Sequence, residues 1–252
     1  MKKIVIVGAT SGIGLLLVEE FAKRGWVVGA AGRNLSALER LATSFQDSVV
    51  VRRIDINAAD ASCELEKLIA AMGGMDVYFH VAGIGFDNLQ LSEREEVAVM
   101  ETNVVGFTRM VDAAFRWFRD NRSGRGEIAA ITSVAGTNGI GCLPSYSASK
   151  SFQQCYLRAL EQICRIEKLR IRFVDIRPGW IRTPLLSENQ SYPMIMSLTY
   201  AVKRIIKAVE RGRRVAVIDW RWRLLVGLWR VVPNWLWVRL PIRVSSISSR
   251  RD

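Results

Sequence analysis

A glycine-rich turn directly after the first apolar run constrains the fold of this chain more than any other feature. Residues 3–7 form a β-branched run that predicts a buried strand. Gly8, Gly12 and Gly14 follow in the pattern G-x-x-x-G-x-G, and an amphipathic stretch over residues 15–24 comes next. A strand, a glycine turn and a helix in this order predict the first unit of a dinucleotide-binding fold.

Each glycine of the turn has its own physical use. Gly8 lets the chain leave the strand sharply, Gly12 lets the backbone approach a ligand, and Gly14 lets the helix pack on the sheet. The helix N-terminus then offers free N–H groups and the positive end of its dipole to a diphosphate. The turn residues expected to bind a nucleotide are Gly8, Thr10, Ser11, Gly12, Ile13 and Gly14.

Apolar runs and amphipathic stretches alternate along the chain up to residue 219. The runs predict further strands over residues 26–31, 49–54, 75–81, 127–132, 171–176 and 215–218. The stretches between them predict helices over residues 35–45, 58–72, 92–119, 144–168 and 197–211. This alternation predicts one α/β domain over residues 1–219, with a doubly wound parallel sheet and helices on both faces.

The end of the second predicted strand bears on the choice between NADP(H) and NAD(H). In dinucleotide folds this strand end meets the adenosine ribose, where an acidic residue accepts from a free 2′-hydroxyl. Here the chain has Gly32-Arg33-Asn34 and no acidic residue. Gly32 leaves space and Arg33 supplies a cation for a 2′-phosphate, which favours NADP(H). NAD(H) is the alternative, with Arg33 stacked on the adenine.

A serine, a tyrosine and a lysine predict a proton-transfer site. Ser133 ends a predicted strand, and Tyr146 and Lys150 lie one turn apart on the same face of a predicted helix. A free tyrosine has a pKa of roughly 10 and is a poor base at neutral pH. We expect the Lys150 ammonium to favour the phenolate and lower the pKa of Tyr146. Ser133 would hold a substrate oxygen beside the phenol, as an alcohol/carbonyl pair requires.

In combination, these motifs resemble the short-chain dehydrogenase/reductase family. The resemblance covers about residues 3–219, in the family's order and spacing. It implies a three-layer Rossmann fold of about seven strands. The motifs that carry it are Gly8-x-x-x-Gly12-x-Gly14, Asp55, Ala82-Gly83, Asn103, Ser133, Tyr146-x-x-x-Lys150 and Pro178-Gly179.

The resemblance also implies roles for these residues. In the catalytic set, Asn103 would position a relay water and Ser133 would orient the carbonyl. Tyr146 would be the general acid in reduction and the base in oxidation, while Lys150 would also bind the nicotinamide ribose. The hydride comes from the nicotinamide, so the protein supplies position and proton control. The further residues implied to contact the cofactor are Asp55, Ile56, Ala82, Gly83, Tyr146, Pro178, Gly179 and Thr183.

The chain departs from the family pattern at Val7, in the glycine turn, where Thr10 and Ser11 leave no basic residue, and after the fourth predicted strand; its Cys and His content is sparse. The family's Asn-Asn-Ala-Gly is His80-Val81-Ala82-Gly83 here. The first asparagine usually ties strands together, and we expect His80 to replace that hydrogen bond as a structural residue. With this one histidine and four cysteines that form no C-x-x-C pair, the sequence predicts no metal site. Unpatterned cysteines in a chain of this size indicate reduced residues of a cytoplasmic protein.

Residues 220–252 form a basic, Trp-rich extension. Residues 201–252 hold 13 Lys and Arg against three Asp and Glu, and so carry +10 of the formal net charge of +12. No charge-free run approaches the roughly 20 residues needed to span a bilayer. Three interpretations stay open: a lid over the substrate or a subunit contact, a helix in the membrane interface, and nucleic-acid binding. The last is least favoured, and we expect no nucleic-acid partner, because the charge is interleaved with aliphatics. The apolar face expected for this helix consists of Trp222, Leu225, Val226, Trp229 and Val232.

The sequence therefore predicts an NAD(P)H-dependent oxidoreductase that interconverts a carbonyl and an alcohol. A non-catalytic dinucleotide sensor or scaffold is the alternative, although it would not need the Ser133, Tyr146 and Lys150 set. The family commonly pairs subunits through helices near residues 92–119 and 146–168, which implies a homodimer or homotetramer. An apolar substrate is favoured by the predicted loop over residues 181–198, which carries Leu185, Leu186, Tyr192, Met194, Ile195 and Met196.

Overall fold

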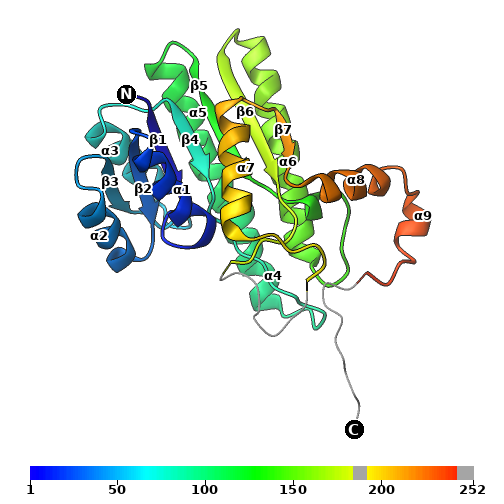
Figure 1. Ribbon diagram of the computed structural model, residues 1–252. Helices are drawn as coiled ribbons and strands as arrows, with labels where there is room; N and C mark the ends of the chain where they lie inside the picture. Colours follow the sequence, from blue (N-terminus) through cyan, green and yellow to red (C-terminus); the bar gives the residue numbers. More distant parts are fainter. Residues whose placement is uncertain (184–191, 243–252) are drawn as a thin grey trace.

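A parallel sheet of seven strands forms the centre of the molecule (Figure 1). The structure is a computed structural model and describes residues 1–183 and 192–242. The strand order is β3-β2-β1-β4-β5-β6-β7, and each neighbouring pair is parallel. The strands are β1 (Lys3–Val7), β2 (Val27–Gly32), β3 (Val49–Arg53), β4 (Val77–His80), β5 (Arg125–Ile131), β6 (Arg170–Arg177) and β7 (Val215–Val217).

Helices cover both faces of this sheet. Along β1, the side chains of Ile4 and Ile6 join one apolar core, and those of Val5 and Val7 join another, because successive residues of a strand point to opposite faces. Helices α1, α2 and α7 pack on the first core, and α3, α5 and α6 pack on the second. The predicted three-layer, doubly wound fold is confirmed. The α-helices are α1 (Gly12–Lys23), α2 (Leu35–Ser44), α3 (Ala61–Ala71), α4 (Glu93–Met100), α5 (Phe107–Asn121), α6 (Pro144–Ile166), α7 (Leu198–Glu210), α8 (Trp220–Trp229) and α9 (Asn234–Trp237).

The direction of winding reverses between β1 and β4. The chain first builds β2 and β3 on one side of β1, and then starts β4 on its other side. The Gly8 amide after β1 donates to the Ala31 carbonyl at 2.9 Å, and the Ala82 amide after β4 donates to the Val7 carbonyl at 2.9 Å. Three strand ends are thus held together at the carboxyl edge, where open α/β sheets bind ligands.

The helix predicted over residues 92–119 is interrupted. Between α4 and α5 lies a π-helical segment, η1 (Glu101–Gly106), which contains the fully buried Asn103. The Asn103 Nδ2 donates to the Ile84 carbonyl at 2.7 Å, and the Asn103 carbonyl accepts from Gln153 Nε2 at 2.9 Å. These bonds to other segments accompany the widened turn that replaces regular helix here. The presence of Asn103 in the middle of this helical stretch is therefore explained by its hydrogen bonds to other segments.

The C-terminal helices α8 and α9 project from the side of the sheet that carries β7, in orange and red in Figure 1. Helix α8 is attached to the body because Trp222 and Val226 belong to the apolar core on the α7 face. In the described part of the chain, no helix is long and apolar enough to cross a bilayer.

Candidate active site

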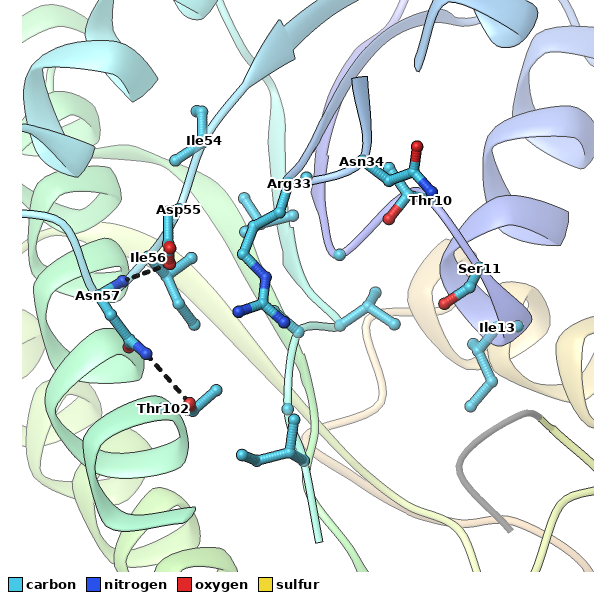
Figure 2. Close-up of a pocket in the computed structure, with 18 of the residues that line it drawn as sticks. Thr10, Ser11, Ile13, Arg33, Asn34, Ile54, Asp55, Ile56, Asn57 and Thr102 are labelled. Carbon is cyan, nitrogen blue, oxygen red and sulfur yellow. Dashed lines mark hydrogen bonds between the residues drawn. The ribbon is translucent and has the colours of Figure 1, made fainter. Parts of the chain in front are cut away.

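A cavity of about 460 Å³ lies at the carboxyl ends of β1 to β4 (Figure 2). Residues from the first three strand ends and from the segment after β4 converge on it, as the sequence predicts for a dinucleotide site. The predicted cofactor residues that line it are Gly8, Thr10, Ser11, Gly12, Ile13, Arg33, Asp55, Ile56, Ala82, Gly83 and Thr183.

Two glycines of the turn allow contacts that no side chain would permit. Gly8 has φ +95°, and a Cβ there would lie 2.5 Å from the Ala82 backbone nitrogen. A Cβ on Gly14 would lie 1.9 Å from the Gly8 carbonyl oxygen. Gly14 does not line the cavity, and it instead lets α1 begin directly against the turn. Both positions therefore require glycine for backbone packing.

The N-terminus of α1 is open toward the cavity. Ser11 is the N-cap residue, and among the described residues its side chain makes no capping hydrogen bond. Thr10 and Ser11 both line the cavity, so their hydroxyls add to the free backbone amides of the first helical turn. This combination of donors and the helix dipole fits a diphosphate.

Arg33 places its guanidinium within the cavity, between the glycine turn and the segment after β3 (Figure 2). The nearby Asp55 accepts a hydrogen bond from the Asn57 backbone amide at 3.1 Å through a carboxylate oxygen. Within residues 1–183 and 192–242, Arg33 forms no ion pair. At Gly32, a Cβ would lie 2.7 Å from the Thr10 side chain. Gly32 therefore makes room for the Thr10 side chain, and the free Arg33 cation fits the 2′-phosphate expected from the sequence.

A second cavity, of about 260 Å³, contains the predicted proton-transfer groups. Ser133, Tyr146 and Lys150 line it, together with Pro178 and Gly179 after β6. The two cavities adjoin, since they share the lining residues Ile13, Val81, Gly83 and Thr183.

Tyr146 and Lys150 lie one turn apart near the start of α6, as predicted, and Lys150 Nζ is 5.7 Å from the centre of the Tyr146 ring. Burial raises the pKa of Tyr146, and a hydrogen bond with Ser133 acts in the opposite direction. The expected lowering of the Tyr146 pKa by Lys150 is not found in this arrangement. Burial also lowers the pKa of Lys150 to about 7, while the Asp175 carboxylate opposes that shift. Desolvation therefore dominates both groups.

Two acceptors hold the Lys150 ammonium. Its Nζ donates to the Ile131 carbonyl and to Gln153 Oε1, both at 3.0 Å. A Cβ on Gly83 would lie 3.4 Å from this Nζ and 3.1 Å from Asn103 Oδ1. Asn103 thus lies behind Gly83 and lines neither cavity. Its amide oxygen accepts from the Ile84 N–H at 2.9 Å, so in this structure it shapes the wall of the site.

The sequence interpretation missed Gln153, which joins two members of the predicted catalytic set. This fully buried side chain contacts Lys150 Nζ through its oxygen and the Asn103 carbonyl through its nitrogen. Its position was readable, because Gln153 follows Tyr146 by seven residues and therefore lies on the same helix face. Further lining residues that the site prediction did not include are, among others, Asn34, Asn57, Thr102, Trp180, Trp222, Leu225, Trp229 and Ile242.

Comparison with known proteins identifies the family. Residues 2–193 match the family model described as short chain dehydrogenase. The chain belongs to the short-chain dehydrogenase family. An uncharacterized oxidoreductase of Myxococcus xanthus is 30% identical over 237 residues, which cover 91% of this chain and 92% of that protein. A 3-ketodihydrosphingosine reductase of Bacteroides thetaiotaomicron is 31% identical over 84% of this chain and 77% of its own length.

A solved short-chain dehydrogenase has the same fold. The enzyme from Sphingobium yanoikuyae, in complex with NADPH, superposes with a TM-score of 0.77 at 21% sequence identity, and the match covers 100% of both chains. The resemblance noted in the motifs is thus confirmed at the level of family and fold, and the chain is an oxidoreductase of this family.

In this short-chain dehydrogenase, the departure at His80 has a different consequence from the one expected. His80 is buried, and its Nδ1 lies 2.9 Å from the Tyr78 hydroxyl on the same strand. Within the described residues its Nε2 has no hydrogen-bond partner, so the side chain does not tie β4 to a neighbouring strand. Burial lowers its pKa to about 3, so the imidazole is neutral and has a structural role, as predicted.

The C-terminal extension contributes to the site through one face of α8. Trp222, Leu225 and Trp229 line the second cavity. A Cβ on Gly179 would lie 2.1 Å from the Trp222 ring, so Gly179 makes room for this indole. The expected apolar face of the extension thus points inward, which agrees with the lid interpretation. Leu185 and Leu186, which contributed to the expectation of an apolar substrate, lie outside the described residues.

Proposed function

We propose that this short-chain dehydrogenase uses NADP(H) to interconvert an apolar carbonyl compound and its alcohol, with Tyr146 as general acid and base. The observation that carries the proposal is the junction of the two cavities. The first cavity shares Ile13 and Gly83 with the cavity that holds Ser133 and Tyr146. When bound, the nicotinamide supplies or accepts the hydride.

The remaining chemistry is assigned to residues of the chain. The Ser133 hydroxyl orients the substrate oxygen, and Tyr146 gives that oxygen a proton in reduction or removes one in oxidation. The raised pKa of Tyr146 keeps the phenol protonated at neutral pH, which favours its use as an acid in carbonyl reduction. Because burial lowers the pKa of Lys150 to about 7, its charged and neutral forms are similarly populated near neutral pH.

Two features support the preferences for cofactor and substrate. The unpaired Arg33 guanidinium in the first cavity favours a 2′-phosphate, hence NADP(H) over NAD(H). The indole and aliphatic wall supplied by Trp180, Trp222, Leu225 and Trp229 favours an apolar substrate. The relative from Bacteroides thetaiotaomicron is named as a reductase of 3-ketodihydrosphingosine, a keto compound, which agrees with reduction of a carbonyl.

Substitution of Tyr146 by Phe tests the proposal. NADPH oxidation is followed against a panel of ketones and aldehydes of increasing chain length, and cofactor affinity is measured separately by calorimetry. Tyr146→Phe should lower kcat at least about a hundredfold and leave the NADPH Kd within about threefold, because only the proton donor is lost.

Tyr156→Phe is the matched control, since it makes the same change on the same helix. The Tyr156 hydroxyl bonds to Asp112 and lines neither cavity. The proposal fails if Tyr146→Phe turns over as fast as Tyr156→Phe. Intact cofactor binding without turnover of any carbonyl by the wild type would support the alternative of a dinucleotide sensor.

A further inference from the structure

The outer face of α8 presents a row of apolar side chains to solvent. Trp220, Leu224 and Leu228 recur every four positions, so they share one side of the helix, and Val231 follows in the turn after its last residue, Trp229. Their exposed fractions are 65%, 60%, 63% and 75%. We call these four residues the apolar ridge. Large apolar side chains gathered in this way on a surface indicate an interaction site.

Arginines flank the apolar ridge on both sides of the helix. By helical position, Arg221 lies between the ridge and the inward face on one side, and Arg223 and Arg230 lie on the other. Arg223 and Arg230 are exposed. An apolar strip bordered by long cationic side chains is the pattern of a helix that lies in a membrane interface.

A basic pocket of about 240 Å³ adjoins one end of the apolar ridge, at Trp220. Its single carboxylate, Asp219, is held by Arg221, with oxygen to nitrogen distances of 2.5 and 3.0 Å. The nearby Glu210 is paired with Arg24 at 2.8 Å. The basic residues that line this pocket are Arg204, Lys207, Arg211, Arg213 and Arg223.

We propose that the apolar ridge and the basic pocket dock this protein on an anionic lipid bilayer, with the ridge among the acyl chains and the pocket on a lipid phosphate. Charge complementarity favours this occupant, because the pocket places five cations beside an apolar insert. An acidic protein would match the pocket alone, whereas a bilayer surface matches both features. Tryptophan at the ridge end and at Trp235 of α9, which is 61% exposed, also suits an interface between water and lipid.

The observations that indicate a lid and those that indicate a membrane contact thus concern opposite faces of one helix. The inward face of α8 lines the second cavity, and the outward face carries the apolar ridge. The lid and interface interpretations of the sequence are therefore compatible. Docking is also independent of the reaction, so it is tested without substrate or cofactor.

Vesicle co-sedimentation tests the docking surface. The full chain is incubated with vesicles of phosphatidylcholine alone or mixed equally with phosphatidylglycerol. We expect the protein to pellet with the mixed vesicles and to be partly released by salt. Leu224→Ser with Leu228→Ser should lower the partition coefficient at least roughly tenfold, because burial of apolar surface is lost. Leu91→Ser with Ile166→Ser is the control, since both residues are exposed on other segments.

A second pair of variants tests the basic pocket. Arg204→Gln with Arg223→Gln should remove most of the preference for phosphatidylglycerol. Arg125→Gln with Arg170→Gln is the control, because these cations form a different basic cluster, at the starts of β5 and β6. If both pairs of variants lost the preference for phosphatidylglycerol equally, net charge alone would explain that preference. The proposed role of the basic pocket would then be overturned.

Two other results would overturn the proposal. Equal pelleting of the wild type and the Leu224/Leu228 variant would remove the apolar ridge from the contact. Light scattering without vesicles compares the mass of that variant with that of the wild type. A smaller mass for the variant, together with unchanged pelleting, would show that the ridge is a contact between copies of the chain. Melting followed by circular dichroism confirms that the exposed substitutions leave the fold intact.

Discussion

The two adjoining cavities are built in different ways. The first is formed largely by backbone turns at the ends of β1 to β4, within the first 102 residues apart from Thr183. The second is formed on one side by residues at β5, α6 and β6. Part of its indole wall comes from α8, whose Trp222 lies more than 70 residues after Lys150 in the sequence. Backbone geometry thus defines one site and side-chain bulk the other, and the two should respond to different substitutions.

Gly14→Ala should have the largest effect and should break the first cavity. The new methyl group would lie 1.9 Å from the Gly8 carbonyl oxygen, so α1 must move away from the turn. We expect a loss of about 3 kcal/mol or more in the free energy of unfolding, measured with urea, and loss of NADPH binding.

Gly227→Ala on α8 is the control for Gly14→Ala. A Cβ there meets no atom within 4 Å, so alanine should be neutral or stabilise by about 0.5–1 kcal/mol. Equal effects of the two changes would contradict the account of the glycine turn.

Arg33→Ala should alter the first cavity without altering the second. Loss of a charge-assisted contact to a phosphate should raise the Kd for NADPH about tenfold to a hundredfold and leave that for NADH nearly unchanged. Calorimetry with both cofactors measures the difference, with Arg40→Ala on the exposed side of α2 as the control. A parallel loss for NADPH and NADH would argue for stacking on adenine instead.

Trp229→Ala should show the reverse pattern. Removal of part of the apolar wall should raise KM for a long-chain carbonyl roughly tenfold and leave the NADPH Kd unchanged. Trp235→Ala is a matched control, because that indole is exposed and lines neither cavity. Should both variants behave alike, α8 would not be part of the substrate site.

Lys150 should make stability depend on pH above neutrality. Burial lowers its pKa to about 7 in the folded chain, so the unfolded chain binds more protons between about pH 7 and the ordinary lysine pKa of 10.5. The free energy of unfolding should therefore rise with pH across this range. Urea titrations at several pH values compare the wild type with Lys150→Met, whose curve should rise less steeply; identical slopes would contradict the shift.

Asp219→Asn should have the smallest effect. Asparagine keeps an acceptor for the Arg221 N–H and tolerates the φ of +73° at this cap, but it loses the ion pair. We expect a loss of less than about 1 kcal/mol at neutral pH. Because the Arg221 hydrogen bond lowers the pKa of Asp219, this stabilisation should vanish as the pH falls through the folded value, and urea titrations in acid measure that loss. If the variant's loss of unfolding free energy persisted unchanged in acid, the effect would come from the helix cap and not from the ion pair.

The same contrast explains what could be predicted from the sequence. The glycine turn and the Tyr146/Lys150 spacing are local patterns, so their places in the two cavities followed from periodicity and turn geometry. The π-helical turn at Asn103 was not predicted, because its hydrogen bonds reach Ile84 and Gln153, which are distant in sequence. The direction of the Tyr146 pKa shift was also wrong, since burial depends on the whole surrounding fold.

Helix α8 shows a different limit of sequence reasoning. Its expected inward face was correct, as Trp222 and Val226 are buried. The opposite face was not recognised as apolar, because arginines at intervening positions lower the apparent amphipathicity of the segment. The position of the helix against the body is needed to tell which face lines the second cavity and which face forms the apolar ridge.

The tryptophans around α8 form a built-in optical reporter. The ring centres of Trp222 and Trp229 are 6.4 Å apart, those of Trp229 and Trp237 are 5.4 Å apart, and the first two indoles line the second cavity. Indole emission overlaps the absorption band of a reduced nicotinamide, so seating that ring beside Tyr146 would quench the protein's own fluorescence. Occupancy of the site can then be followed in real time on unlabelled material, even for variants that no longer turn over.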